Sequence, residues 1–452
     1  MNPKIAVVIL VGVLVAAGIS MPLILNANNE AKRALDMELE IYGNANGDWT
    51  IDSADVERLE KIISGEEVKT TFADANGDGR IDQKDIDQVN GIIKNTASRI
   101  WLKDGVGNDR NVGTNPQRVF AEYLSNVELM LILGQKDKIV GIDAAAEHFG
   151  DFYFGKDGTK DLTVVQSSHS PPWEVMEELD LDIILAYNWT SLETKWEKLP
   201  TVDVFYLGMY APGILDREGS SYVQAYLKAG YIFRQVDRAE DYVEWYLGTM
   251  KEINDKSADV PDADRPSVLM TGVAPFTMGP TRPWTVATII DPMDQSAVMA
   301  GAMTLGKTVL SAEMYAGGPT QSTWSVGVDP ETIAVTDIDY AFCLSAKYSF
   351  GGSISATAPD SGYGVKDRTD FDDFQKMASE NQFMDNTHVY LITNNLREGG
   401  SGGLLLTAYI AKIIYPDLFK DIDPLDYHQK YVEWMGIDAD VREEAVFISP
   451  SF

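Results

Sequence analysis

The residues with the clearest chemistry form two runs of oxygen-bearing side chains that begin 30 residues apart. Each run has Asn or Asp at loop positions 1, 3, 5, 9 and 12, and position 7 offers a backbone carbonyl. Because Ca²⁺ prefers about six to eight oxygen ligands, this spacing predicts two calcium sites. The predicted ligands are Asn44, Asn46, Asp48, Thr50, Asp52 and Asp55 in the first loop, and Asp74, Asn76, Asp78, Arg80, Asp82 and Asp85 in the second.

Each loop is followed by one amphipathic helical pattern. Apolar residues recur at helical spacing over residues 56–63 and 86–93. A calcium loop followed by one helix, twice, without the entering helix of an EF-hand, resembles the dockerin type I module over residues 40–96. The resemblance implies Ca²⁺ binding and a cohesin-like surface partner. The alternative is a purely structural calcium module between the membrane and the main domain.

The first loop departs from the dockerin pattern at two positions. Trp49 stands at position 6, where glycine normally makes the sharp turn, and position 1 is the neutral Asn44. A neutral ligand attracts a cation less than a carboxylate does. We therefore expect the first site to bind calcium more weakly than the second.

The composition excludes several classes of protein. The 452 residues include 37 Lys and Arg against 69 Asp and Glu, a net charge of −32, which disfavours nucleic-acid binding. The single cysteine, Cys343, excludes an internal disulfide framework, a Cys-based zinc or iron–sulfur site and a lipidated N-terminal cysteine. The length predicts two or three domains.

The N-terminus has an uncharged apolar stretch over residues 5–25. As a helix it would span roughly 30 Å, the thickness of the hydrocarbon core of a membrane. Residues 1–30 are therefore predicted to form a hydrophobic helix, either an uncleaved membrane anchor or a cleaved signal segment. In both cases the rest of the chain lies on the extracytoplasmic side, anchored or secreted, which without a lipidated cysteine would suit an archaeal cell surface.

From about residue 97 the pattern changes to short apolar runs that alternate with helical segments. The runs include residues 118–121, 138–143, 183–186 and 204–207, then 267–270, 340–343 and 389–392. This alternation predicts two α/β lobes, at about 97–220 and 265–452. A long amphipathic stretch between them, about residues 221–257, is predicted to be a linking helix with Gly230 as its break.

Five segments in this region carry a second resemblance: residues 115–119, 125–134, 137–142, 274–279 and 411–424. Their order and spacing resemble a cluster A-type substrate-binding protein, from the family that serves ABC importers of iron–siderophore complexes, haem and cobalamin. The resemblance implies the class III periplasmic-binding fold, in which a rigid helix joins two lobes that hold the ligand between them. It also implies an ABC permease as partner.

The same family docks onto its permease through one exposed glutamate on each lobe. By local motif these are Glu174 and Glu331, which occupy matching positions in two internally similar segments. The alternative is that both are acids favoured by a helix N-terminus.

Loops after the strands are expected to face the ligand. Aromatic faces with a few cations suit a bulky planar or anionic chelate, although ordinary packing explains each aromatic equally well. The predicted ligand-binding residues are Tyr123, Trp173, Tyr187, Trp189, Tyr210, Phe276, Arg282, Trp284, Tyr348 and Arg397. The glycine-rich run 399–403 lacks the lysine of a phosphate loop and indicates close backbone approach.

Four histidines are too few for a bare transition-metal importer, which favours a chelated metal. We expect an iron–siderophore chelate first, then cobalamin or haem. The leading hypothesis is a solute-binding component of an ABC importer and not an enzyme, because no nucleophile–base pair stands in a recognisable context. The alternative is a surface scaffold that works through its dockerin-like module.

Overall fold

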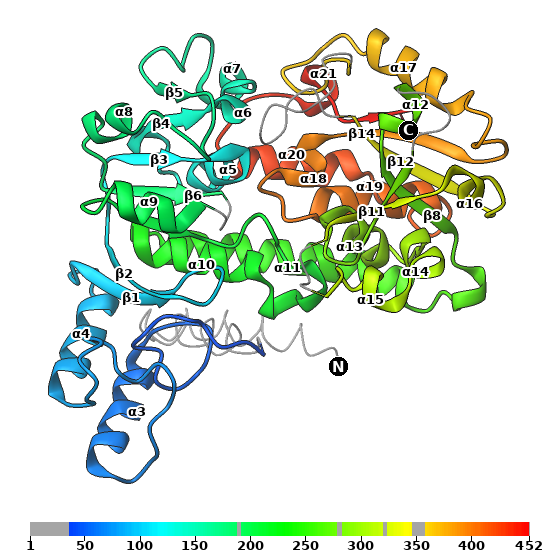
Figure 1. Ribbon diagram of the computed structural model, residues 1–452. Coiled ribbons are helices and arrows are strands. Elements are labelled where there is room, and N and C mark those ends of the chain that lie inside the picture. Colours follow the sequence, from blue (N-terminus) through cyan, green and yellow to red (C-terminus); the bar gives the residue numbers. More distant parts are fainter. Residues whose placement is uncertain (1–35, 188–190, 278–282, 320–322, 346–357, 452) are drawn as a thin grey trace, which may run out of the picture.

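The computed structural model describes residues 36–187, 191–277, 283–319, 323–345 and 358–451. Two α/β lobes lie side by side over a pair of linking helices, and a small helical module lies beneath the first lobe (Figure 1). The α/β class, the two lobes and the small all-α module predicted from the sequence are confirmed.

The first lobe is built on a five-stranded parallel sheet in the order β5-β4-β3-β6-β7. Strands β3 and β6 are buried along their whole length, which explains their continuous apolar runs. The strands are β3 (Val119–Ala121), β4 (Ile139–Asp143), β5 (Thr163–Val165), β6 (Ile183–Ala186) and β7 (Asp203–Tyr206). The helices are α5 (Tyr123–Ile132), α6 (Ala144–Glu147), α7 (Gly150–Phe154), α8 (Trp173–Glu178) and α9 (Leu192–Lys198).

The second lobe has a sheet in the order β10-β8-β12-β14-β16, in which only β16 runs antiparallel to its neighbour. The strands are β8 (Ser267–Gly272), β10 (Met303–Thr304), β12 (Tyr340–Ser345), β14 (His388–Thr393) and β16 (Ile448–Ser449), with the small pairs β9 (Trp284–Ala287) with β11 (Ser325–Val328) and β13 (Gly362–Tyr363) with β15 (Ala445–Val446). The helices are α12 (Ala274–Thr277), α13 (Pro292–Met299), α14 (Leu305–Val309), α15 (Ala312–Tyr315), α16 (Pro330–Ala334), α17 (Thr369–Ser379), α18 (Asn394–Glu398), α19 (Leu404–Ile414), α20 (Pro424–Trp434) and α21 (Val441–Glu444).

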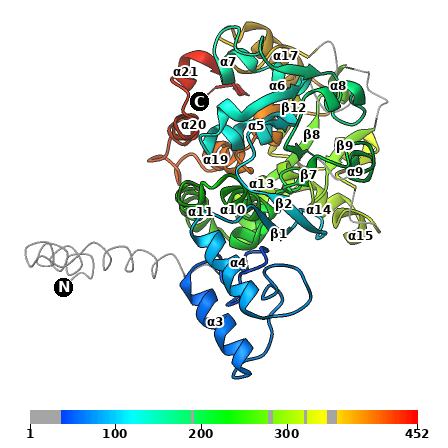
Figure 2. The ribbon, with the colours of Figure 1, turned by 90° about the vertical axis from the view of Figure 1, so that its left-hand side faces the viewer.

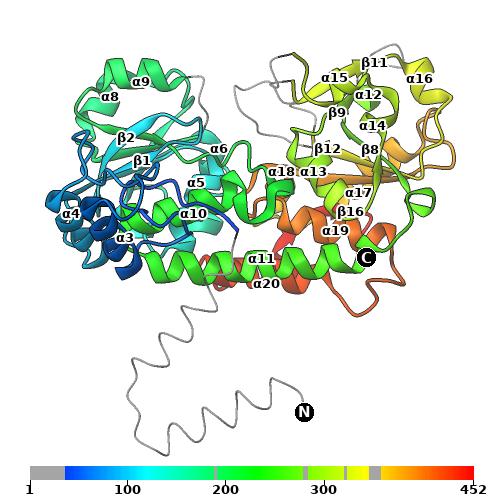
Figure 3. The same cartoon turned by 90° about the horizontal axis from the view of Figure 1, so that it is seen from below.

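The stretch between the lobes is not one helix with a break at Gly230, and that prediction is wrong. It forms α10 (Ser221–Phe233) and α11 (Val236–Ala258). The two helices pack antiparallel. The rings of Tyr222 and Tyr246 lie 4.6 Å apart, and those of Tyr226 and Tyr242 lie 4.4 Å apart, so the start of α10 lies beside the middle of α11 and its later residues lie beside the first turns of α11. The long helix that joins the lobes is therefore α11 alone, which runs beneath both (Figure 3).

The reversal takes place at Arg234, whose φ of +56° ends α10. Gly230 has a different role. A Cβ atom there would lie 2.7 Å from the Cβ of Ala239 on α11, so the glycine allows the two helices to approach closely next to the turn.

The helical module consists of α3 (Ser53–Ser64), α4 (Gln83–Ile93) and the loops before them. Asp52 and Asp82 cap these helices through matching capping boxes. A hairpin of β1 (Arg99–Lys103) and β2 (Asp109–Gly113) follows. One hydrophobic cluster contains Leu59 of α3, Leu102 of β1 and Tyr226 of α10, so the module shares its core with the lobes above it (Figure 2).

The segment before α3 joins the module to this hairpin. The amide of Tyr42 donates to the carbonyl of Trp101 at 2.9 Å, and the amide of Lys103 donates to the carbonyl of Glu40 at 3.0 Å. Ile41 forms an antiparallel bridge with Leu102. The module is thereby hydrogen-bonded to the chain that leads into the first lobe.

In the described part of the chain, no helix combines the length and the apolar character needed to cross a bilayer. The predicted N-terminal helix of residues 1–30 lies outside the described residues.

Two glycine-to-alanine variants test the packing of the linking helices. Gly230→Ala should lower the free energy of unfolding by about 1–3 kcal/mol, because its new methyl group must displace Ala239. Gly248→Ala, on the exposed face of α11 with open space around its Cβ position, should raise it by up to about 1 kcal/mol. Equal effects in urea unfolding would contradict the close approach at Gly230.

Candidate functional site

Tyr123 is held between the two lobes at the first turn of α5. It follows β3, and its backbone amide donates to Asp143 Oδ2, at the end of β4, at 3.0 Å. Its hydroxyl accepts a hydrogen bond from Asn394 Nδ2 of the second lobe at 2.8 Å. Tyr123 also has a φ of +65°, a strained value for a residue with a side chain. The strain persists because contacts from both lobes fix the residue.

An aromatic wall extends from Tyr123 across the interlobe surface. Tyr123 stacks on Tyr187 with ring centroids 3.9 Å apart, and the edge of Tyr210 meets Tyr187 at 4.9 Å. Trp324 of the second lobe meets Tyr210 at 4.6 Å. Tyr123 and Tyr187 are buried, whereas Tyr210 and Trp324 are half-buried. The wall therefore passes from the core to a partly accessible edge.

Arg397 of α18 lies against this wall. Its Nη2 donates to Asp291 Oδ2 at 2.7 Å, and its Nε donates to Asp291 Oδ1 at 3.3 Å. Asp291 in turn caps α13 by accepting the Met293 amide at 2.9 Å. Burial alone would lower the Arg397 pKa, but Asp291 and the nearby phenols of Tyr187 and Tyr210 raise it. Arg397 is therefore a fixed cation beside aromatic faces.

A buried ion pair, Glu122 with Lys195, fixes the backbone next to the aromatic wall. Lys195 Nζ lies 3.1 Å from Glu122 Oε1, and both side chains are at most 2% exposed. The other carboxylate oxygen of Glu122 accepts the Tyr187 amide at 3.0 Å and fixes the backbone where that ring begins. No sequence pattern indicated this pair, because Lys195 is one of several charged residues on the short helix α9.

The predicted ligand-binding residues fall into three groups: those that meet at the lobe interface, those that pack against the core of one lobe, and those outside the described residues. Tyr123, Tyr187, Tyr210 and Arg397 come together as described. Trp284 is 1% exposed and packs edge-on against Phe276 at 5.0 Å in the core of the second lobe, which fits the packing alternative. Trp173 is half-buried at the start of α8 and packs on the core of the first lobe. Trp189, Arg282 and Tyr348 lie outside the described residues.

Glu174 and Glu331 occupy equivalent places on the two lobes. Each lies in the first turn of a short helix, α8 and α16 respectively, and each is exposed. Figure 3 shows both helices on the side of the molecule opposite α11. Their place fits one contact per lobe on a flat partner, and it equally fits acids favoured by a helix N-terminus.

A buried carboxyl group joins the lobes below the wall. Glu128 of α5 accepts hydrogen bonds from the hydroxyls of Tyr153 and Tyr431 and from the amide of Gly400. Burial raises the pKa of Glu128 to about 7, although these three donors act in the opposite direction. Tyr431 and Gly400 belong to the second lobe, so this carboxyl group is part of the lobe interface.

The second calcium loop has the donor set and backbone that Ca²⁺ requires. Gly79 at position 6 has a φ of +87°. Asp74 at position 1 accepts the amides of Asp78 and Gly79 at 3.1 and 2.8 Å, and Asp85 at position 12 accepts those of Asn76 and Asp82 at 3.2 and 2.8 Å. These bonds turn both carboxylates toward the loop. Asp74, Asn76, Asp78, Asp82, Asp85 and the Arg80 carbonyl would hold the ion.

The first loop has the same capping box but a different interior. Asn44 is fully buried, and its side-chain amide donates to the carbonyls of Leu39 and Asp48 at 2.9 and 2.5 Å. The side-chain amide of Asn46 donates to Asp48 Oδ2 at 2.7 Å. N–H groups therefore occupy places where a calcium loop needs oxygen atoms facing a cation.

In the described residues no three His, Cys, Asp or Glu side chains are gathered closely enough to hold a metal ion. Of the four histidines, His428 is fully buried between the hydroxyls of Tyr363 and Tyr409, and burial lowers its pKa to about 3. His148 lies 3.6 Å from Asp360, across the lobe boundary.

Comparison with known proteins supports both resemblances. Residues 42–94 match the family model of the dockerin type I domain. No curated protein sequence matches the chain. The two calcium loops and the helices α3 and α4 lie within the matched residues, so the dockerin resemblance predicted from the sequence is confirmed.

The rest of the chain resembles solved periplasmic binding proteins. The TroA-like periplasmic binding protein FepB from Veillonella parvula is 15% identical, with a TM-score of 0.58, covering 77% of this chain and 98% of that one. CeuE from Helicobacter pylori, solved with a nickel–histidine complex, is 13% identical with a TM-score of 0.55, covering 76% and 98%. MolA from Haemophilus influenzae, solved with molybdate, is 12% identical with a TM-score of 0.51, covering 74% and 97%.

These likenesses define the class of protein: the chain has the class III periplasmic-binding fold, as predicted from the sequence. The two ligands named, a nickel–histidine complex and molybdate, differ in kind, so the fold alone does not select one of them.

The buried carboxyl of Glu128 predicts a dependence of stability on pH. Its pKa is about 7 in the folded chain against 4.5 when exposed, so the folded state retains a proton that the unfolded state has lost between these values. The free energy of unfolding should therefore fall as pH rises from about 4.5 to 7, by roughly 2–4 kcal/mol from this group.

Glu128→Gln, neutral at every pH, should remove this contribution. The measurement is urea unfolding across the pH range, compared with the exposed control Glu178→Gln, which should keep the wild-type slope. A Glu128→Gln slope equal to the wild-type slope would contradict the prediction.

Proposed function

We propose that this chain is the solute-binding component of an ABC importer, that it works on the extracytoplasmic face of the cell membrane, and that it captures a metal chelate. The observation that carries the proposal is the aromatic wall of Tyr123, Tyr187, Tyr210 and Trp324, to which both lobes contribute, with Arg397 fixed beside it. The three tyrosines follow strands of the first lobe, whereas Trp324 precedes β11. The fold adds the expectation that ligand lies between the lobes.

The chemistry of the wall favours a large, partly planar and anionic ligand. Aromatic faces stack on flat or apolar ligand surfaces, and a guanidinium donates to carboxylate or hydroxamate oxygens. Asp291 offsets part of the Arg397 charge, so recognition would rely on directed hydrogen bonds more than on net charge. An iron–siderophore chelate fits this description first, then cobalamin or haem.

Delivery to a permease is supported by the placement of Glu174 and Glu331. Both are exposed, one stands on each lobe, and both lie on the side away from α11. Two separated Glu–Arg pairs are individually weak, but together they fix the orientation of a receptor on its transporter.

The dockerin match favours a second candidate function, capture of a cohesin-like partner at the cell surface. The exposed side chains of Ile63 and Val68 lie at and just after the end of α3, where a partner could bind. This candidate and the receptor function do not exclude each other. Membrane attachment through residues 1–30 remains a prediction.

Native mass spectrometry of the full chain, purified from a metal-replete medium that contains siderophores, haem and cobalamins, tests the receptor function. We expect one retained chelate per chain. Arg397→Gln should weaken its binding about tenfold or more, because a charge-assisted hydrogen bond is lost. Arg265→Gln, which alters a surface ion pair with Asp262, is the control and should bind normally. A chain that stays empty after challenge with each chelate contradicts the proposal.

Permease docking has its own test in cells that import the radiolabelled chelate. Glu174→Lys together with Glu331→Lys should reduce uptake about tenfold or more while chelate affinity stays unchanged, because reversed charges repel arginines. The control is Glu178→Lys alone, with Glu174 and Glu331 unchanged, because Glu178 is an exposed residue of the same helix α8. Normal uptake by the double variant would show that both glutamates are only helix-terminal acids.

A further inference from the structure

The two loops of the dockerin-like module share a sequence pattern and several hydrogen bonds, including those to Asp55 and Asp85 at position 12, but they differ at positions 1 and 6. At position 1, Asp74 offers two carboxylate oxygens, whereas Asn44 turns its N–H groups toward the carbonyls of Leu39 and Asp48. The remaining oxygen of Asn44 accepts the Gly47 amide at 3.1 Å. The buried side chain of Asn44 therefore links Leu39, Gly47 and Asp48 by hydrogen bonds. A bound cation would otherwise hold this part of the loop together.

Position 6 also differs between the two loops. Gly79 takes a φ of +87°, but Trp49 does not adopt a positive φ, so the sharp turn of the second loop is absent from the first. The Trp49 side chain is 2% exposed. It lines a pocket of about 310 Å³ at the seam between module and linking helices, together with Tyr231 and Glu240.

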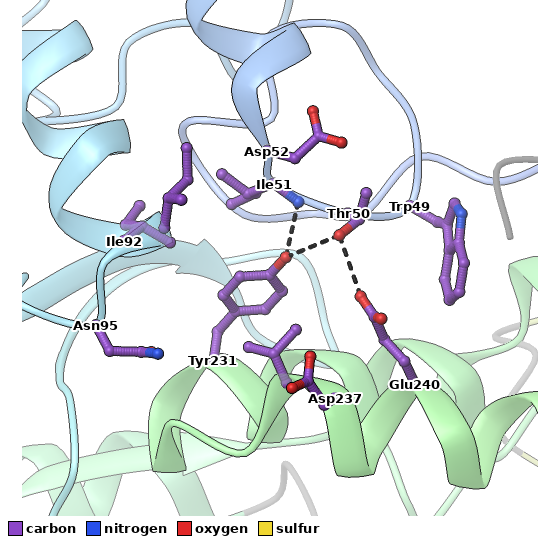
Figure 4. Close-up of a pocket in the computed structure, with 11 residues that line it drawn as sticks. Trp49, Thr50, Ile51, Asp52, Ile92, Asn95, Tyr231, Asp237 and Glu240 are labelled. Carbon is purple, nitrogen blue, oxygen red and sulfur yellow. Dashed lines mark hydrogen bonds between the residues drawn. The ribbon is translucent and has the colours of Figure 1, made fainter. Parts of the chain in front are cut away.

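Positions 7 and 8 of the first loop contact the linking helices directly. The amide of Ile51 donates to the Tyr231 hydroxyl at 2.7 Å, and Thr50 Oγ1 donates to Glu240 Oε1 at 3.1 Å. Figure 4 shows Tyr231 and Glu240 pointing from α10 and α11 toward Thr50 and Ile51. These contacts fall on and next to Thr50, whose carbonyl is the predicted ligand of position 7.

Two further polar side chains of α10, Lys228 and Gln224, contact the segment that leads into the module and are buried against it. Lys228 Nζ lies 2.5 Å from Glu40 Oε2 with its side chain 2% exposed. Gln224 donates to the Glu38 carbonyl at 2.7 Å and accepts the Glu40 amide at 3.3 Å. Buried polar groups of this kind are costly unless paired, so α10 is adapted to a docked module.

We propose that the first loop is not a calcium site and instead docks the module onto α10 and α11, so that the dockerin-like module is a fixed part of the receptor and only its second loop binds calcium. This inference is independent of the proposed ligand, because none of its residues belongs to the aromatic wall.

The first test counts calcium ions on the full chain by native mass spectrometry and equilibrium dialysis with Ca²⁺ alone. We expect one ion per chain. Asp48→Ala and Asp78→Ala alter the same loop position 5 in the first and second loops. Asp78→Ala should weaken binding about tenfold or more, and Asp48→Ala should leave the affinity unchanged. Two ions per chain, one of them lost in Asp48→Ala, would overturn the proposal.

The second test measures docking by hydrogen–deuterium exchange. Tyr231→Phe removes the acceptor of the Ile51 amide and should speed exchange in residues 48–52 about tenfold, while residues 76–82 stay unchanged. Tyr226→Phe, in the same helix, removes a hydrogen bond to the Gly400 carbonyl and is the matched control, which should leave residues 48–52 unchanged. Unchanged exchange in Tyr231→Phe, or equal acceleration by both variants, would overturn the docking role.

Discussion

The position of each lobe depends on a set of buried tyrosine hydroxyls on the linking helices. Tyr222 and Tyr226 of α10 both donate to the Gly400 carbonyl, and Tyr246 of α11 donates to the Gly402 carbonyl. A buried hydroxyl without a partner costs about 1–3 kcal/mol, so this interface tolerates little sliding. The glycine-rich run makes it possible, because a Cβ at Gly402 would lie 2.5 Å from the Tyr222 ring.

These hydrogen bonds between the linking helices and the glycine-rich run explain why the aromatic wall can be assembled from distant parts of the chain. Gly400 follows α18 closely, so fixing its carbonyl and amide also fixes Asn394 and Arg397. The Asn394 side chain then reaches the Tyr123 hydroxyl of the other lobe. Lobes held this way present a preformed surface, and a preformed surface loses less conformational entropy when it binds a ligand.

The sequence predicted those features that depend on local pattern. Buried strands produce apolar runs, and strand ends pointed to Tyr123, Tyr187, Tyr210 and Arg397. It did not indicate the reversal at Arg234, because both linking helices have the same apolar period and the turn contains neither glycine nor proline. Nor did it indicate the contacts of Asp291, Asn394 and Trp324, because pairs such as Asn394 and Tyr123 are separated by 271 residues.

The two loops show how far a local motif can be interpreted. Their capping boxes and helices are alike, because these depend only on neighbouring residues. Their interiors differ at positions 1 and 6. Tyr231 and Glu240 contact the first loop, and the second loop keeps four carboxylates and a turn-forming glycine. A cation and a protein surface satisfy the same carbonyl and carboxylate groups by different means. In the first loop the contacts of Tyr231 and Glu240 take the place that we propose a cation has in the second loop, and Asn44 and Trp49 at positions 1 and 6 fit that arrangement.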